Sequence, residues 1–192
     1  MRRRSRRSRP GAPWTLLPVL GAPLLHAPVL RFDLLTAVKR PIDGGRTFGG
    51  RRILGDNKTW RGALVMVTGV EAAALALNRS EAYRRRLPPG VRDARPALVG
   101  ALLGVATFAG ELPNSFAKPR LGIAPGGHRT DAAGVALAIV DQADFVLAAW
   151  LLLAPVHRMS AREAATAFAV VAAVHVPINL VGYRVGARDT PI

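Results

Sequence analysis

Apolar and polar residues follow one another along the chain in long blocks, and five blocks are apolar enough to be membrane spans. They run from about Trp14 to Leu30, Ala63 to Leu77, Ala97 to Gly110, Ala132 to Leu153 and Ala164 to Val181. A straight helical crossing needs roughly 20 apolar residues, so we expect the second and third spans to extend into flanking polar residues. The first contains Pro18, Pro23 and Pro28, which bend or interrupt helices, so it is either a kinked span or a re-entrant segment.

This pattern predicts an all-α integral membrane protein with about five transmembrane helices. It divides the chain into a basic N-terminal tail at 1–13, a single membrane-embedded domain at 14–182 and a C-terminal tail at 183–192. A basic start before an apolar run is also typical of a signal peptide. However, there is no small-x-small cleavage site, and Pro28 follows Ala27, where cleavage would have to occur. We therefore expect a solvated basic tail.

The net charge of +15 and the pI near 11.8 first suggest a nucleic-acid-binding protein. The three Trp, two Tyr and six Phe residues are not interleaved with base-reading polar side chains, so we expect no nucleic-acid partner. A basic chain that is half apolar instead fits a membrane protein whose loops face anionic head groups. The absence of Cys excludes disulfides, thiolate catalysis and Cys-ligated zinc.

The loop between the first two spans, DGGRTFGGRRILGDNKTWRG, combines glycines with cations. Asp56 or Asn57 can cap the following helix, because both side chains accept backbone N–H groups. Lys58 and Arg61 are three residues apart, so we expect them to share a face of that helix start and to form an anion site there. The glycines would let the backbone approach a bulky anion. The alternative is a basic loop that lies on lipid head groups.

A second polar group follows the third span, in GELPNSFAKPRLG. Glu111 is expected to end the span, and Pro113 to stop the helix from continuing regularly. The side chains that follow are Asn114, Ser115, Lys118 and Arg120. This mixture of carboxylate, amide and cations suits a polar ligand near the bilayer surface. An ordinary helix end with a cap and a positive flank is the alternative.

Two carboxylates, Asp141 and Asp144, lie inside the apolar fourth span. They are three residues apart, so on a helix both point the same way. An ionised Asp inside a bilayer costs a few kcal/mol or more, and two on one face need a compensating charge. Paired carboxylates that hold Mg²⁺ beside substrate phosphates provide one. The alternative is an ion pair with an Arg or Lys that reaches in from a loop, since no span interior contains either.

Cations, a Gly-rich loop and a carboxylate pair for Mg²⁺ together describe a phosphate site within a membrane. A reaction between two phosphates needs no Ser-His-Asp pattern, because an ionised phosphate monoester can itself attack phosphorus. The protein then has to screen charge repulsion, align the attack and stabilise the leaving group.

The segments PIDGGRTFGGRRILGDNKTWRG, GELPNSFAKPRLGI, APGG and DQADF, in this order, resemble the CDP-archaeol synthase family, which is similar to bacterial CDP-diacylglycerol synthases. The resemblance implies Mg²⁺-dependent transfer of CMP from CTP to a phosphorylated diradylglycerol of the archaeol phosphate or phosphatidate type, with release of pyrophosphate. It also implies a five-helix, multi-pass protein of the cell membrane whose catalytic loops face the cytoplasm. The Arg and Lys residues are divided almost evenly between the two sides, so the positive-inside rule does not choose this orientation.

The resemblance also implies roles for individual residues. Lys58, Asp141 and Asp144 would be catalytic, and the two aspartates would hold the metal. The residues expected at the substrates are Asp43, Arg46, Asp56, Asn57, Arg61, Glu111, Asn114, Ser115, Lys118 and Arg120. Among these, Arg46, Asn57 and Lys58 are candidates for contacts with CTP, whereas Asp43 and Asp56 would order the loop. The expected partners are CTP, the lipid phosphate and membrane lipids.

Two other classes fit parts of the sequence. A CDP-alcohol phosphotransferase also uses Mg²⁺ and carboxylates in membranes. Its signature has Ala-Arg closely after an Asp-Gly and two Asp four residues apart, whereas here Ala-Arg does not follow Asp43 and the pair is three apart. A lipid-binding protein without enzymatic activity would not need Asp141 and Asp144.

Overall fold

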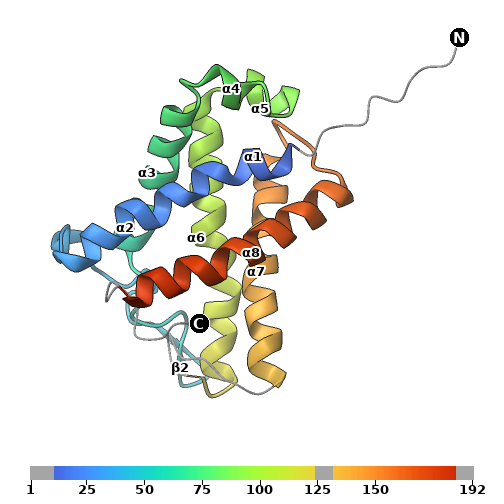
Figure 1. Cartoon of the computed structure of the whole chain (residues 1–192). Coiled ribbons are helices and arrows are strands. Elements are labelled where there is room, and N and C mark those ends of the chain that lie inside the picture. Colours follow the sequence, from blue (N-terminus) through green and yellow to red (C-terminus); the bar gives the residue numbers. More distant parts are fainter. Residues whose placement is uncertain (1–10, 124–131, 185–192) are drawn as a thin grey trace, which may run out of the picture.

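The computed structural model describes residues 11–123 and 132–184, which form an almost entirely helical protein (Figure 1). The elements are α1 (Ala12–Leu16), the 3₁₀ helix η1 (Leu17–Leu20), α2 (Gly21–Arg31), the 3₁₀ helix η2 (Thr36–Val38), β1 (Thr47–Phe48), β2 (Arg51–Arg52), α3 (Trp60–Leu77), α4 (Glu81–Arg84), α5 (Pro89–Asp93), α6 (Pro96–Arg120), α7 (Ala132–Leu153) and α8 (Ala161–Arg184). The predicted all-α class is confirmed, with one short hairpin added.

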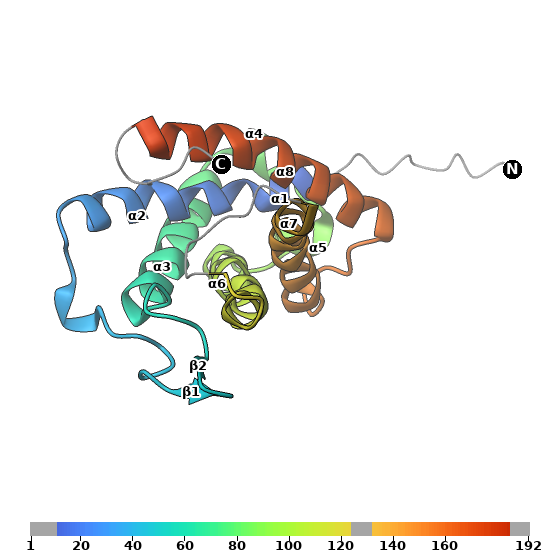
Figure 2. The ribbon, with the colours of Figure 1, turned by 90° about the horizontal axis from the view of Figure 1, so that it is seen from below.

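Helix α6 lies between α3 and α7 and packs along both. The segment from α1 to α2 crosses α3, and α1 also contacts α8. Figure 2 views α6 and α7 nearly end on, with α2 and α8 lying across the group. Val70 of α3, Leu103 of α6 and Leu153 of α7 are fully buried and belong to one apolar core.

Two glycines bring the backbones of α3 and α6 into direct contact. A Cβ atom on Gly100 would lie 2.6 Å from Cα of Glu71, and one on Gly104 would lie 2.6 Å from Cα of Val67. Small residues four apart on one face permit such close approach between membrane helices. In lipid the hydrophobic effect does not drive apolar side chains together, so close packing matters more. The spacing therefore fixes the relative position of the two helices.

Three helical segments of the described residues are long and apolar enough to cross a membrane: Pro13–Arg31, Trp60–Leu77 and Pro96–Arg120. In the first, the helix type changes at Pro18, where η1 separates α1 from α2, whereas Pro23 and Pro28 lie within α2. It is therefore a long interrupted helix. Helices α7 and α8 have 22 and 24 residues, and a total of five spans stays a prediction.

The prediction that Pro113 stops the helix from continuing regularly was wrong. Helix α6 continues through Pro113 and Pro119 to Arg120. Each proline removes one backbone hydrogen bond, a cost that packing on neighbouring helices can offset in membrane proteins. Here α6 stays packed against α7 at Gly110, where a Cβ atom would lie 3.0 Å from the carbonyl oxygen of Asp144.

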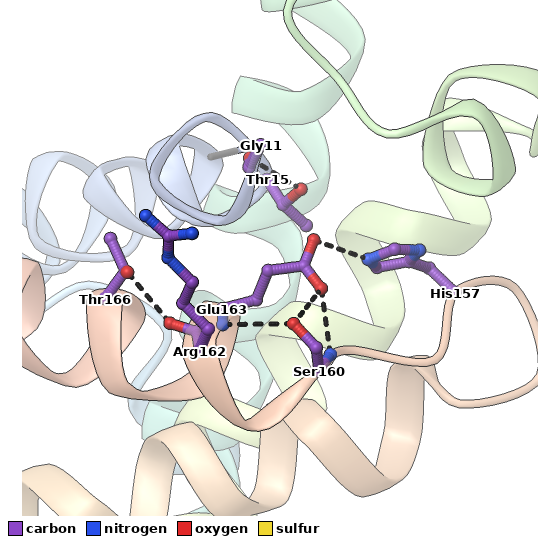
Figure 3. Close-up of polar contacts among 7 residues, drawn as sticks. All are labelled: Gly11, Thr15, His157, Ser160, Arg162, Glu163 and Thr166. Carbon is purple, nitrogen blue, oxygen red and sulfur yellow. Dashed lines mark hydrogen bonds and ion pairs between the residues drawn. The ribbon is translucent and has the colours of Figure 1, made fainter. Parts of the chain in front are cut away.

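The start of α8 is closed by a capping box (Figure 3). The backbone N–H of Glu163 donates to Oγ of Ser160, and the N–H of Ser160 donates to the Glu163 carboxylate at 2.8 Å. The other carboxylate oxygen lies 3.3 Å from Nε2 of His157. This arrangement satisfies the free N–H groups of a helix start and joins α8 to the preceding loop.

Candidate functional site

The first loop and the C-terminal end of α6 meet at the lower end of the molecule in Figure 1. Nη1 of Arg51 donates to the carbonyl oxygens of Pro119 and Arg120 at 2.6 and 2.7 Å. In return, the guanidinium of Arg120 lies 3.5 Å from the ring centroid of Phe116 and 5.5 Å from that of Phe48. Two polar segments, joined by a contact between residues 68 apart in the sequence, therefore form one surface.

The first loop is built on a tight hairpin. Gly49 and Gly50 connect β1 to β2 with φ values of 61° and 73°. Two consecutive left-handed residues are what a two-residue hairpin turn requires, and glycine adopts them without steric cost. These glycines thus serve the turn, whereas the sequence suggested close approach to an anion. A Gly-Gly pair between short segments was the available signal for the hairpin.

Asp43 holds the base of the hairpin. Its carboxylate is buried and accepts the backbone N–H groups of Gly45 and Leu54, both at 3.0 Å, and Nη2 of Arg52 at 2.7 Å. Burial raises the pKa of Asp43, but the hydrogen bonds from Arg52, Leu54 and Gly45 outweigh it and lower the pKa to about 2. Asp43 is therefore ionised at any physiological pH and ties the two arms of the loop together.

The helix cap differs from the sequence expectation, which was wrong for Asp56 and Asn57. Thr59 is the N-cap of α3, and its Oγ1 accepts the N–H of Gly62 at 3.1 Å. Thr59 directly precedes the first helical residue, and threonine is itself a good N-cap. Asp56 is exposed and accepts Nη1 of Arg52 at 2.5 Å. Asn57 is exposed beside it.

Lys58 and Arg61 do not share a helix face, contrary to the prediction. Lys58 precedes the cap and is therefore not on the helix, and its ammonium forms an ion pair with the carboxylate of Glu111 on α6. Arg61 is buried, and its Nη1 donates to the Asp33 carboxylate at 2.6 Å and to the carbonyl oxygen of Leu34 at 3.1 Å. The structure gives Arg61 a partner within the fold and leaves Lys58 at the surface shared with α6.

Asp33 was missed at the sequence level. It follows α2 with a φ of 44° and accepts hydrogen bonds from both Lys39 and Arg61. These two hydrogen bonds lower the pKa of Asp33, so it remains a carboxylate that balances the buried guanidinium. No local pattern signals this role, because its partner Arg61 lies 28 residues away in the sequence.

The polar residues at the end of α6 are spread over its last three turns. Asn114 is only 3% exposed, whereas Glu111, Ser115, Lys118 and Arg120 are half-buried. Oγ of Ser115 donates to the carbonyl oxygen of Glu111 at 2.8 Å, so Ser115 bonds along its own helix. Arg46 is exposed on the loop facing solvent. Positions 111, 114 and 118 recur at helical spacing and share one side of α6.

Asp144 of α7 lies next to this end of α6. The backbones of Gly110 and Asp144 are in contact, and the Asp144 side chain is half-buried. The side chain of Asp141 lies outside the described residues. No three His, Asp or Glu side chains form a metal-binding group in the part of the chain that the structure describes.

The donor set nevertheless fits Mg²⁺. This ion prefers oxygen ligands and is usually held by one or two carboxylates together with substrate phosphates. Asp144 and Glu111 supply carboxylates, and Asn114 supplies an amide oxygen, from two helices that touch at Gly110. A cluster of three protein carboxylates is not needed for such a site.

A helical membrane scaffold with cations and oxygen donors gathered at one end defines an intramembrane protein suited to phosphorylated ligands. One solved structure with this fold, described as an intramembrane enzyme for archaeal membrane lipid biosynthesis, is similar with a TM-score of 0.61 and 27% identity. The match covers 86% of this chain and 90% of that one.

The CarS-like CDP-archaeol synthase family model matches residues 23–192. The chain is 36% identical to the CDP-archaeol synthase of Halobacterium salinarum over 165 residues, which is 79% of this chain and 83% of that protein. It is 33% identical to that of Methanosarcina barkeri (79% and 90% coverage) and 32% identical to that of Archaeoglobus fulgidus (83% and 88%). The chain belongs to the CDP-archaeol synthase family.

Proposed function

We propose that this protein transfers CMP from CTP to a phosphorylated diradylglycerol of the archaeol phosphate type and releases pyrophosphate. Membership in the CDP-archaeol synthase family supports the reaction and the substrate class. The site is assigned from one observation: the first loop is hydrogen-bonded to the end of α6, beside Asp144 of α7. That junction lies at one end of the helices, where a nucleotide from water and a lipid head group can meet.

In this proposal the lipid phosphate is the nucleophile. One of its oxygens bonds to the α-phosphorus of CTP while the bond from that phosphorus to the oxygen bridging to the β-phosphate breaks, and pyrophosphate takes that electron pair. Lys58 exchanges its Glu111 partner for phosphate oxygens of CTP. Arg46 and Asn57, both exposed on the loop, bind the nucleotide alongside it. Asp43 keeps the loop in shape through Arg52.

Asp141 and Asp144 would hold Mg²⁺. When bound, the ion supplies positive charge that screens the phosphates and stabilises the leaving pyrophosphate. The protein residues then have to orient the two substrates and keep their phosphates apart from bulk water. Glu111 and Asn114 line the same end of α6 and are positioned to orient the lipid phosphate or the ion.

The test is turnover by the purified full-length protein with CTP, Mg²⁺ and a panel of lipid phosphates with ether or ester chains. We expect equal amounts of CDP-lipid, detected by mass spectrometry, and pyrophosphate. Formation of CMP from a supplied CDP-lipid and an alcohol, without pyrophosphate, would instead assign a phosphotransferase. Lipid binding without any nucleotide conversion would remove the enzymatic proposal.

We also propose that the site faces the cytoplasm, because CTP is there. The first loop and the segment after α6 would then lie inside, and the loop from α4 to α5 outside. The chain has no Cys, so Leu121→Cys and Arg85→Cys can be labelled individually without background; both positions are exposed. An impermeant maleimide added to intact cells should label position 85 and spare position 121. The opposite result would invert the topology.

A further inference from the structure

A second polar feature lies at the end of the molecule opposite the candidate site. It is an open cavity at the protein surface, with a volume of about 520 Å³. The residues lining it are Asn78, Arg84, Arg92, Asp93, Ala94, Arg95 and Pro96. Figure 1 shows α4 and α5 at the top and β2 at the bottom. Helix α3 connects the two ends, and its 18 residues span about 27 Å.

The cavity is strongly cationic. Three guanidinium groups line it against one carboxylate, Asp93, which Nε of Arg92 contacts at 3.3 Å. Among the residues that the structure describes, no carboxylate lies within ion-pair distance of Arg84 or Arg95. Both side chains therefore line the cavity without an anionic partner among the described residues.

Other arginines at this end behave differently. Nη2 of Arg85 donates to Glu81 at 2.5 Å, and the Arg86 guanidinium lies 4.3 Å from the ring centroid of Trp14. Arg85 and Arg86, which are not among the residues lining the cavity, therefore have partners within the protein. Arg84 and Arg95 line the cavity without such a partner among the described residues, which leaves both guanidinium groups available to an anion.

The start of α6 adds to the positive potential. Arg95 is its N-cap residue, no described side chain caps it, and Pro96 at the first position has no N–H. The free N–H groups and the dipole of this 25-residue helix favour an anion near Arg95. This contribution reinforces the arginines at the cavity wall.

We propose that this cavity binds a phosphoryl anion at the membrane surface opposite the candidate site. Guanidinium groups match the geometry of phosphate oxygens through paired hydrogen bonds, which favours phosphate over a simple halide. The cavity lies where α3 ends and α6 begins, and the ends of membrane-spanning helices meet the head-group layer. The phosphoryl group can thus belong to an anionic lipid or to free phosphate.

A thiol placed in the cavity reports binding there and not at the candidate site. Ala94→Cys introduces the only Cys of the chain, and its alkylation by N-ethylmaleimide is followed by mass spectrometry of the full-length protein. One arm adds inorganic phosphate to detergent-solubilised protein, with chloride of equal ionic strength as reference. The other compares nanodiscs of an anionic phosphoglycerol lipid with nanodiscs of a lipid with an uncharged sugar head group.

We expect the phosphoryl probe to slow alkylation several-fold, because it covers the thiol and offsets the cations that favour the thiolate. Protection in the phosphate arm alone identifies a free ion as the source, and protection in the lipid arm alone identifies a head group; either supports the proposal. Arg84→Gln/Arg95→Gln should abolish the protection. Arg79→Gln, which removes an exposed charge next to Asn78 but outside the cavity wall, should retain it.

Three results would overturn the proposal: no protection in either arm, equal protection by chloride, or equal loss in Arg79→Gln and in Arg84→Gln/Arg95→Gln. All three arginines are exposed, so the variants are expected to fold, and their thermal unfolding midpoints check this directly. Because the thiol is at the far end of the molecule, the result does not depend on whether the proposed transferase reaction is correct.

Discussion

The two ends of the molecule arrange their charges in opposite ways. Around the hairpin, the carboxylates lie against cations: Asp33 with Arg61, Asp43 with Arg52 and Glu111 with Lys58. Around α4 and α5, the cavity has more guanidinium groups than carboxylates, and Arg84 and Arg95 lack a partner among the described residues.

This difference separates two ways of receiving an anion. At Lys58, an incoming phosphate would replace the Glu111 carboxylate, so binding there exchanges one ion pair for another. At the other end, an anion would meet cations already exposed.

The largest effect is expected at the carboxylates of α7. Asp141→Asn and Asp144→Asn keep volume and remove charge, so kcat should fall at least about 100-fold if these groups hold the metal. The measurement is CDP-lipid formation as a function of Mg²⁺ concentration. Glu71→Gln is the control, since it neutralises another carboxylate in an apolar helix away from the loops. Near-normal activity of both Asn variants at saturating Mg²⁺ would reject the metal assignment.

Lys58 should have the next largest effect. Removing one charge-assisted hydrogen bond costs about 1.5–3 kcal/mol, so Lys58→Ala should weaken CTP binding roughly tenfold to a hundredfold. Lys58→Arg should restore part of it, because a guanidinium presents its donors differently from an ammonium. Calorimetry with a non-hydrolysable CTP analogue measures the affinity. Lys39→Ala, which removes the same residue type from the same loop on the Asp33 side, should bind normally.

Substitution of Gly104 tests the packing of α3 against α6, the helices that connect the two ends of the molecule. In Gly104→Ala the added Cβ would lie 2.6 Å from Cα of Val67, so the free energy of unfolding should fall by about 1–3 kcal/mol. Thermal unfolding in detergent measures this. Gly62→Ala is the matched control, since its Cβ would meet only Oγ1 of Thr59 at 3.6 Å. If both variants unfold alike, backbone contact is not what holds α3 to α6.

The smallest effect is expected for Asp43→Asn. It removes the charge that holds Arg52, so proteolysis of the loop between Gly44 and Gly55 should become a few-fold faster. Asp56→Asn, with one exposed contact, should change it less.

The pH dependence of the loop follows from the lowered pKa of Asp43. Its stabilising contribution is fully present above the ordinary pKa of 3.8 and is lost as pH falls through about 2. Proteolysis of the loop by a pH-tolerant protease should therefore not respond to Asp43 ionisation between about pH 5 and 8. A midpoint in that range would contradict the contacts described for this carboxylate.

The sequence allowed the helices and the polar segments of the site to be predicted, because both depend on local composition. Apolar length identified α3, α6 and the first segment, and unusual polar residues identified Glu111 and Asp144. The helical path through Pro113 could not be predicted, since packing on α7 offsets a local penalty.

Contacts between residues distant in the sequence could not be predicted either. Nothing near Lys58 indicates Glu111, which is 53 residues away, and nothing near Arg61 indicates Asp33. The prediction that Lys58 and Arg61 share a helix face assumed that α3 includes Lys58, whereas α3 begins at Trp60. The position of Thr59 as N-cap decides that geometry, and several residues there are chemically able to cap.

The glycine contact between α3 and α6 has a consequence for the lipid around the protein. The 18 residues of α3 span about 27 Å, slightly less than the roughly 30 Å of a typical hydrocarbon layer. Two helices that packed through flexible side chains could slide to match a thicker bilayer, but backbones in contact at Gly100 and Gly104 cannot. A thicker bilayer must therefore be matched by local thinning or by polar residues that flank the helices, and the cost of hydrophobic mismatch varies with the chain length of the surrounding lipids.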